Sequence, residues 1–280
     1  MSNVYKIMRN LIILIISIIL VLEILFPIYW VLSSSLTNAE YLFRKPLHYY
    51  PIGFNFENYI KVIKSVPVGR YFFNSLIISI ISAFFSVFLG FIASYGFVRM
   101  RLPLKNILLF FILATMFLPQ MVMVFPLYET FREIKLLNTI WAIIILNISN
   151  NLPIVIWLMV SFIRQVPIEI EESALIDGAN VFRIVKNVMG PILRPALGVF
   201  YLITFITSWN ELLWPLVFST DERSKTLAVG LLELPRIIER AGVPWNLTSA
   251  GSVLMILPII ILAIVFQKQI VGGLTEGAVK

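Results

Sequence analysis

Hydrophobic residues run in long blocks along this 280-residue chain, and short polar segments separate them. An α-helix needs about 20 apolar residues to cross the hydrocarbon core of a bilayer. Six blocks reach that length, at about 11–32, 71–98, 106–128, 139–163, 196–218 and 249–267. The pattern predicts an all-α polytopic membrane protein, with one domain over residues 1–280, six transmembrane helices and both termini on the same side.

The composition supports a membrane environment and narrows the chemistry. Hydrophobic residues make up 59% of the chain and charged residues 13%, whereas a soluble domain has about 25% charged residues. The chain has no Cys and a single His, His48, which excludes thiolate metal sites and most histidine-based catalysis. The net charge of +7 comes from basic residues scattered between apolar blocks. Loop topology and anionic lipid headgroups explain that charge more simply than nucleic acid does.

The short loops carry the signal for orientation. Lys6 and Arg9 precede the first block, and the segment VRMRLPLK at 98–105 is dense in cations. Because cytoplasmic loops are enriched in Lys and Arg, we expect both termini in the cytoplasm and a multi-pass chain in the cell membrane. The first block is too long for a signal peptide and has no clean cleavage site of small residues, so we expect an uncleaved span.

Three of the blocks are interrupted by proline or polar residues. Pro119 and Pro126 interrupt the third block, NISNNLP at 147–153 the fourth, and WNELLWP at 209–215 the fifth. A broken helix survives in lipid only where its free backbone groups face protein or a water-filled cavity. Each interruption is either a kink satisfied by neighbouring helices or part of a polar path through the bundle.

Amide side chains suit a path for hydroxylated solutes, because each amide offers hydrogen-bond donors and acceptors. The candidate path residues are Asn147, Asn150, Asn151, Asn210 and Glu211. The same groups could instead join neighbouring helices. Glu23 and Glu211 are acids inside apolar blocks, and such residues are hypotheses for function by default.

The polar segment at 164–195, between the fourth and fifth blocks, begins with the signals of a short helix. Pro167 suits a helix start, and the acids that follow favour the first turns of a helix; they are Glu169, Glu171 and Glu172. Gly178 is a natural C-terminal stop, because glycine adopts the left-handed conformation without steric cost. We expect this helix to expose three apolar residues within a rim of acids: Ala174, Leu175 and Ile176.

A second helix is predicted after a tight turn. Asn180 can cap its N-terminus, and an apolar stripe follows, formed by Phe182, Val185 and Met189. Pro191 and Pro195 are expected to close this helix. The result is a compact helix–turn–helix. It could rest on the bilayer surface as an amphipathic pair, but acid-rich helices suit an anionic membrane poorly, so a soluble protein partner is the better interpretation.

Several motifs in this chain resemble those of ABC importer permeases. The EAA signature of that family resembles Glu172-Ser173-Ala174, Asp177-Gly178-Ala179, Val188, Pro191 and Pro195, with Ser173 in place of the usual Ala and Val188 in place of the usual Ile. Three more segments are similar to carbohydrate-uptake permeases of the maltose type, the MalG-like subunits: LPQMVMVFPLYETF at 118–131, TSWNELLWPLVF at 207–218 and FQKQIVGGLTEGAVK at 266–280. The similarity runs from about residue 11 to residue 280.

The resemblance implies a transmembrane permease subunit of an ATP-driven, binding-protein-dependent importer for sugars or oligosaccharides. In that family the EAA segment is a cytoplasmic coupling helix that docks on the ATPase, which assigns coupling to Glu172, Ser173, Ala174, Asp177, Gly178 and Ala179. By the same resemblance the C-terminal tail meets the ATPase through Thr275, Glu276 and Gly277. The resemblance also implies that the last outer loop meets the external binding protein through Arg236, Arg240, Pro244 and Trp245; a solvated loop with Trp245 as an interfacial anchor is the equal alternative.

The partners implied by the resemblance are a second permease in a heterodimer, ATP-binding subunits and an extracytoplasmic solute-binding protein. The chain has no Gly-Lys-Ser/Thr phosphate loop, so ATP and Mg are expected on the ATP-binding subunits. We expect no catalytic residue, metal or cofactor in this chain, which is not predicted to be an enzyme. For Glu23 we expect an ion pair with the second permease.

Other classes stay open as alternatives. An ion-driven secondary transporter usually shows an internal repeat with charges at matching positions, whereas no repeat is visible here and Glu23 and Glu211 lie in unlike contexts. A membrane enzyme is disfavoured by the lone His48 and the lack of Cys. Among importers, sugars of any length, glycerol phosphate and polyols are all candidate solutes, because specificity is shared with partner chains.

Overall fold

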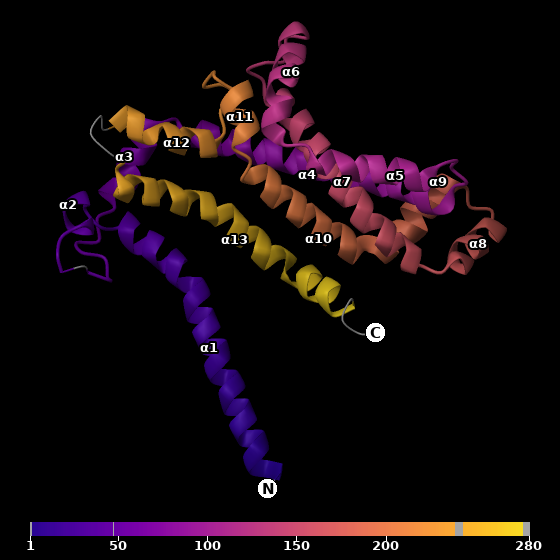
Figure 1. Cartoon of the computed structure of the whole chain (residues 1–280), viewed down its shortest axis with the longest axis horizontal. Coiled ribbons are helices and arrows are strands. Elements are labelled where there is room, and N and C mark those ends of the chain that lie inside the picture. The colour runs from indigo at the N-terminus through magenta and orange to yellow at the C-terminus, as the bar shows by residue number, and fades with distance from the viewer. Residues whose placement is uncertain (1, 47, 239–242, 277–280) are drawn as a thin grey trace. The chain divides into compact units, whose positions relative to one another are not determined.

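The computed structural model describes residues 2–46, 48–238 and 243–276 (Figure 1), and every regular element in these ranges is helical. The elements are α1 (Ser2–Ser35), α2 (Ala39–Leu42), α3 (Glu57–Ser65), α4 (Val68–Arg99), α5 (Lys105–Ala114), the 3₁₀ turn η1 (Thr115–Phe117), α6 (Gln120–Glu133), α7 (Ile140–Gln165), α8 (Ile168–Ile176), α9 (Val181–Arg183), the π-helical turn η2 (Ile184–Met189), α10 (Gly190–Trp209), α11 (Leu213–Phe218), α12 (Leu227–Ile238) and α13 (Trp245–Glu276). They belong to two compact units: unit 1 is Met1–Val68 with Leu231–Leu257, and unit 2 is Gly69–Gly230 with Pro258–Lys280. The predicted all-α fold class is confirmed.

Stretches long and apolar enough to span a membrane occur in five single helices and one bent pair of the described chain. The five are Tyr5–Ser35, Val68–Arg99, Ile140–Gln165, Val181–Trp209 and Trp245–Gln267. The pair is Lys105–Phe117 with Gln120–Glu133, bent by 97°. A set of five to six candidate spans agrees with a polytopic membrane protein.

The third apolar block, at 106–128, is not one helix. Leu118 has an extended backbone, with φ −73° and ψ 121°, and Pro119 then precedes the first residue of α6. The cause is steric, because a proline disfavours the helical conformation of the residue before it and lacks a backbone donor. Pro126 lies inside α6, so the break occurs at Pro119 alone.

The other two predicted interruptions have opposite outcomes. The fifth block is broken as predicted, since α10 ends at Trp209 and α11 begins at Leu213. The predicted break at 147–153 is wrong, because α7 continues through a buried Pro153. More than half of the most apolar stretch of α7 is buried, at 56%. In such a setting neighbouring helices and local adjustments re-satisfy the backbone groups that a proline frees.

A row of small residues on α4 allows close packing against α7. Buried serines and one glycine recur every three or four residues along this row: Ser79, Ser82, Ser86, Gly90 and Ser94. The hydroxyls of Ser82 and Ser94 donate to the carbonyls of Ile144 and Ile156, at 3.4 and 3.0 Å. A Cβ at Gly90 would lie 2.5 Å from Val155 Cγ1. Small residues are typical of close helix packing in membranes.

The second helix of the 164–195 segment does not end at Pro191 and Pro195, contrary to the prediction. α9 passes through η2 into α10, and the helix continues to Trp209. The Gly190 N–H bonds the Val185 carbonyl, five residues earlier. An α-helical turn would bring the Pro191 ring against the carbonyl four residues before it, and the wider π turn relieves that contact.

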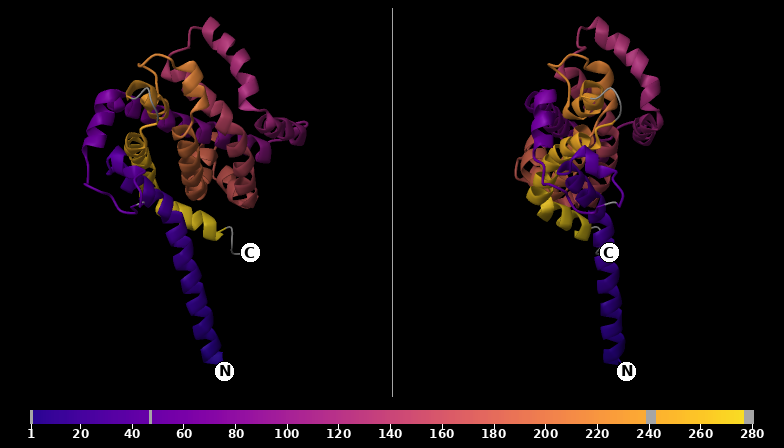
Figure 2. Two further views of the ribbon diagram at one scale, coloured as in Figure 1. Left: turned by 60° about the vertical axis from the view of Figure 1, so that its left-hand side comes forward. Right: turned by 90° about the vertical axis from the view of Figure 1, so that its left-hand side faces the viewer.

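Unit 1 contains α1, which runs as one unbroken helix of 34 residues (Figure 2). None of the side chains in its most apolar stretch is buried. A helix that is apolar all round is stable only in lipid or against other apolar surfaces. Glu23 lies on this exposed surface.

Candidate functional site

The 164–195 segment contains a rigid elbow at the end of unit 2 where α4 and α7 finish (Figure 1). We define the elbow as residues 167–189. At the end of α8 the Ala179 N–H bonds the Ala174 carbonyl at 2.9 Å, and the Gly178 N–H bonds the Leu175 carbonyl at 3.0 Å. This pair of bonds is a Schellman cap, and Gly178 adopts the left-handed φ of +81° that the cap requires. The predicted helix stop at Gly178 is confirmed.

The turn continues directly into the second helix of the elbow. Asn180 Oδ1 accepts a hydrogen bond from the Arg183 N–H at 2.9 Å, which confirms the predicted N-cap. The inner side of the elbow contributes the buried Ile184 and Met189 to a cluster shared with α4, α7 and α10. Its partly buried side chains pack against this cluster: Ala174, Ala179, Val185 and Val188. Such close packing transmits displacement, because protein interiors are dense and have low compressibility.

The outer side of the elbow presents apolar side chains within an acidic rim. Leu175, Ile176 and Phe182 are 52%, 86% and 72% exposed. Glu172 and Asp177 are exposed as well, and neither pairs with a cation in the described part of the chain. We call these five residues the docking face. Exposed apolar patches with polar rims mark interaction sites.

The small residues of the EAA-like segment divide between the two sides of the elbow. Ser173 is exposed, and its hydroxyl donates to the Glu169 carbonyl at 2.7 Å. Ala174 and Ala179 are half-buried. The expectation of an exposed Ala174 is wrong, because its side chain packs on the buried cluster.

Glu171 is the residue of this segment that sequence reasoning did not separate from its acidic neighbours. Its side chain is 6% exposed, whereas Glu172 is exposed. Arg99 Nε donates to Glu171 Oε1 at 2.6 Å, and the Tyr95 hydroxyl donates to Glu171 Oε2 at 2.8 Å. Glu171 lies three residues before Ala174, and the two share the helix face that packs against the bundle; because the sequence predicted an exposed Ala174, it gave no signal that Glu171 is buried.

The amides predicted to line a solute path have different roles in the structure. Asn151 is buried; its Nδ2 donates to Ser208 Oγ at 3.1 Å, and its Oδ1 accepts from Thr207 at 2.8 Å. These bonds join α7 to α10. Asn147 is also buried, and its Nδ2 has no hydrogen-bond partner in the described chain. Asn147 and Asn151 thus face the helix bundle.

Asn150 faces a cavity instead. Its Oδ1 accepts from Gln120 Nε2 at 3.0 Å, and both residues line a space of about 220 Å³ that Thr115, Ser149 and Trp214 also border. The break at Pro119 ends at this cavity, since Gln120 is the first residue of α6. Irregular backbone at membrane depth is tolerated where it is buried in protein or lines a cavity.

The last two path candidates lie at the break between α10 and α11. The Glu211 carboxylate accepts from the N–H groups of Leu213 and Trp214, at 2.9 and 3.4 Å, and caps α11. Asn210 ends α10, with its N–H bonded to the Ile206 carbonyl at 3.1 Å, and its side chain is exposed. The structure therefore gives Glu211 a local structural role and places Asn210 beside it.

The predicted partner contacts outside the elbow lie near the edges of the described chain. Thr275 and Glu276 are the last residues of α13, and Arg236 lies in α12. The side chains of these three residues are not among those described. Gly277 and Arg240 lie outside the described residues. Pro244 is buried, and Trp245 begins α13 with its side chain 54% exposed. The segment 219–248, predicted to be an outer loop, contains α12 and is therefore not an open loop.

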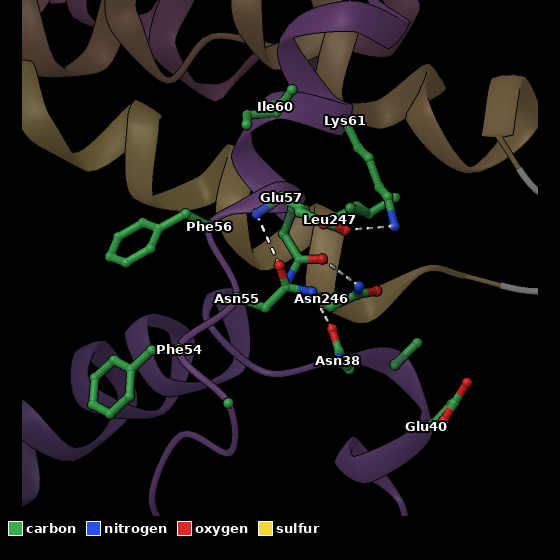
Figure 3. Close-up of a pocket in the computed structure, with 13 residues that line it drawn as sticks. Asn38, Glu40, Phe54, Asn55, Phe56, Glu57, Ile60, Lys61, Asn246 and Leu247 are labelled. Atoms are coloured by element: carbon green, nitrogen blue, oxygen red, sulfur yellow. Dashed lines mark hydrogen bonds and ion pairs between the residues drawn. The ribbon is translucent and has the colours of Figure 1, made fainter.

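Unit 1 has a polar cavity of about 820 Å³ that sequence reasoning missed (Figure 3). Four asparagines lie in its wall, and each of them bonds a protein group. Asn38 and Asn55 bond each other, Asn246 Nδ2 donates to Asn58 Oδ1 at 2.9 Å, and Asn58 Nδ2 donates to the Ser35 and Thr37 carbonyls at 2.8 and 3.0 Å. Asn246 Oδ1 is buried without a hydrogen-bond partner in the described chain. Since the other amide contacts bond protein groups, we interpret the cavity as part of the structural contact among α1, α3 and α13. The described residues contain no group of three His, Cys, Asp or Glu side chains able to hold a metal ion.

Five to six candidate spans, a cavity at the break of the third span and a packed elbow with an exposed docking face define a polytopic membrane transport subunit. The chain belongs to the family of binding-protein-dependent transport system inner membrane components, whose sequence profile matches residues 86–275. It is thus a permease of the ABC importer type and not an enzyme.

Curated relatives match almost the whole chain. The sulfoquinovosyl glycerol transport system permease protein SmoH of Agrobacterium fabrum is 30% identical, over 94% of this chain and 91% of its own. The trehalose/maltose transport system permease protein MalG of Thermococcus litoralis is 29% identical, over 98% of both chains. The arabinooligosaccharides transport system permease protein AraQ of Bacillus subtilis is 30% identical, over 99% of this chain and 97% of its own.

A solved structure has the same fold. It is a chain of a bacterial ABC transporter involved in the import of the acidic polysaccharide alginate, with a TM-score of 0.76 and 23% sequence identity. The match covers 93% of this chain and 96% of that chain. At this identity the similarity supports the fold alone.

Proposed function

We propose that this chain is the permease subunit of an ATP-driven importer for sugars or oligosaccharides, and that the elbow couples it to a partner ATPase. The docking face is the observation that carries this proposal. It combines three exposed apolar side chains with two carboxylates that have no cation partner in the described chain. A soluble partner with an apolar cleft rimmed by Lys or Arg would bury the three apolar side chains and neutralise the two carboxylates.

The proposal orients the chain in the cell membrane. The elbow and the cation-rich segment 98–105 lie on the cytoplasmic side with both termini, because the ATP-binding subunits are cytoplasmic. The whole chain, residues 1–280, forms one transmembrane domain beside a second permease. At the cytoplasmic end the proposed tail contacts are Thr275, Glu276 and Gly277, and at the outer end the proposed binding-protein contacts are Arg236, Arg240, Pro244 and Trp245.

The proposed solute class follows from the relatives and from the chemistry of the cavity. The three relatives described above are named for glycosides or oligosaccharides. The cavity at the Pro119 break is lined by apolar side chains together with the amides of Asn150 and Gln120, and amides bond sugar hydroxyls in both directions. We place the solute path there. Asn147, Asn151, Asn210 and Glu211 then belong to its supporting structure.

A second solute class is favoured by one relative. The sn-glycerol-3-phosphate transport system permease protein UgpE of Rhizobium meliloti is 27% identical over 91% of this chain. Glycerol phosphate is an anion, so its import would require cationic groups on the binding protein or along the path. Competition between labelled sugars and sn-glycerol 3-phosphate for uptake separates the two classes.

The test of function is reconstitution. The chain is placed in vesicles with the permease, ATP-binding subunits and binding protein encoded beside it, and labelled sugars are added outside. We expect uptake only with internal ATP and external binding protein. Uptake by this chain alone on an imposed ion gradient would overturn the proposal in favour of a secondary transporter.

A further inference from the structure

We propose that Arg99, Glu171 and Tyr95 form a joint that transmits displacement of the elbow to the spans α4 and α7. This inference rests on the proposed function, because it concerns how the docked elbow moves the spans. The three are positioning residues: they contact neither solute nor nucleotide, and they act by fixing α8 to the ends of two membrane helices.

One guanidinium connects three helices. Arg99 is the last residue of α4, and its Nε donates to Glu171 Oε1 on α8 at 2.6 Å. Its Nη2 donates to the carbonyls of Val166 at 2.7 Å and Ile163 at 3.3 Å, which end α7. The planar guanidinium holds these directions in a fixed geometry.

The carboxylate of Glu171 is held on both oxygens. Oε1 accepts from Arg99 and Oε2 from the Tyr95 hydroxyl at 2.8 Å, one turn earlier on α4. The side chains of Arg99 and Glu171 are 13% and 6% exposed. Bonds between charged groups shielded from water are shorter and stronger than neutral ones, so this contact resists sliding of α8 along α4.

Two adjacent glutamates point to different sides of α8. Glu172 is exposed on the docking face, whereas Glu171 is buried against α4. Successive residues on a helix differ by about 100° around its axis, so a force applied at Glu172 reaches the joint through a single residue of backbone. Ala174 and Ala179 make apolar contacts to the same bundle, and apolar attraction is non-directional. The joint supplies the directional contact.

The decisive experiment compares transport with ATP hydrolysis in the full reconstituted importer. Glu171→Gln keeps the shape of the side chain and removes its charge. Arg99→Lys keeps the positive charge and removes the planar guanidinium that bonds three partners at once. We expect both variants to purify with the ATP-binding subunits and to hydrolyse ATP at a basal rate within twofold of the original assembly. The number of solute molecules imported per ATP should fall at least tenfold. A purely structural role would lower the amount of assembly, and with it both rates in proportion.

The matched control is Glu129→Gln. Glu129 is half-buried and pairs with the exposed Arg132 on α6, so this change removes the same charge from an ion pair away from the elbow. We expect it to leave imported solute per ATP unchanged. An unchanged ratio in Glu171→Gln would overturn the joint, while ATP-dependent uptake by the original assembly would still support the proposed function.

Two further measurements decide the case if Glu171→Gln does not assemble. Tyr95→Phe keeps the ion pair and removes one hydrogen bond, and we expect a two- to fivefold loss in solute imported per ATP; no loss would overturn the proposal. The chain has no Cys, so spin labels at Ser173→Cys and Arg101→Cys, both exposed positions, report the distance between the elbow and the end of α4. We expect one narrow distance with and without ATP, and a broadened distribution in Tyr95→Phe. A narrow distance in that variant would count against the joint.

Discussion

Substitution of Gly178 by a residue with a side chain is the most direct test of the role of the elbow. Its φ of +81° lies in the left-handed region, which costs a residue with a Cβ about 1–2 kcal/mol. No atom lies within 4 Å of the place a Cβ would occupy, so steric clash within the chain adds nothing to that cost. Gly178→Val therefore either holds a strained turn or opens the Schellman cap.

The free-energy cost of the substitution can be calculated from the hydrogen bonds of the Schellman cap. Opening it releases the two hydrogen bonds of 2.9 and 3.0 Å made by Ala179 and Gly178, each worth about 1 kcal/mol net. Holding the strained turn and opening the cap therefore each cost about 1–2 kcal/mol. A cost of this size lowers the ratio of native turn to opened turn roughly 5- to 30-fold. A β-branched residue in this region is a steric outlier, whereas Asn tolerates the left-handed conformation.

The assay is retention of the ATP-binding subunits during purification, together with ATP-dependent uptake. We expect Gly178→Val to lose both and Gly178→Asn to keep most of both. Gly53→Val is the matched control: Gly53 has a φ of +90° and likewise no atom within 4 Å of a Cβ, but it lies in unit 1. It should retain the ATP-binding subunits. Full uptake by Gly178→Val, or equal loss in Gly53→Val, would refute the reasoning.

Three other predictions concern charge, packing and hydrogen bonding. Glu172→Lys should weaken binding of the ATP-binding subunits about tenfold through repulsion of partner cations, measured by titration against the same change at the exposed Glu133; equal binding would contradict the docking face. Gly90→Ala should destabilise the chain by about 1–3 kcal/mol in a thermal unfolding assay, because the new Cβ would lie 2.5 Å from Val155 Cγ1. The control is Gly96→Ala, whose Cβ would lie 3.8 Å from its nearest contact, Met100, and it should be neutral in the same assay. Asn151→Leu removes two interhelical hydrogen bonds and should cost about 1 kcal/mol for each; an unchanged midpoint would show that Ser208 and Thr207 find other partners.

Local chemistry was predictable from the sequence wherever one or two residues decide the outcome. The stop at Gly178 and the cap at Asn180 follow from backbone conformation and from an unsatisfied N–H group, and both are present. The apolar blocks likewise indicated the spans, because hydropathy over about 20 residues depends on no tertiary contact.

Outcomes that depend on neighbouring helices were not predictable in the same way. Pro119 breaks its segment whereas Pro153 does not, and the two prolines differ in surroundings rather than in chemistry. Glu171 and Glu172 are identical in type, yet the position of Arg99 buries one and leaves the other exposed. The sequence alone contains neither the packing of α7 nor the distance from α4 to α8.

The π-helical turn η2, at the end of the elbow, makes the orientation of the docking face relative to α10 depend on the exact number of residues in 184–189. Its Gly190-to-Val185 bond encloses one more residue than an ordinary helical turn. Deleting one residue there would rotate everything on its N-terminal side by about 100° and shift it by about 1.5 Å along the axis. The whole docking face would then turn relative to α10, and Glu171 would move away from Arg99 on α4. Natural variation within 184–189 should therefore exchange one amino acid for another while conserving the number of residues.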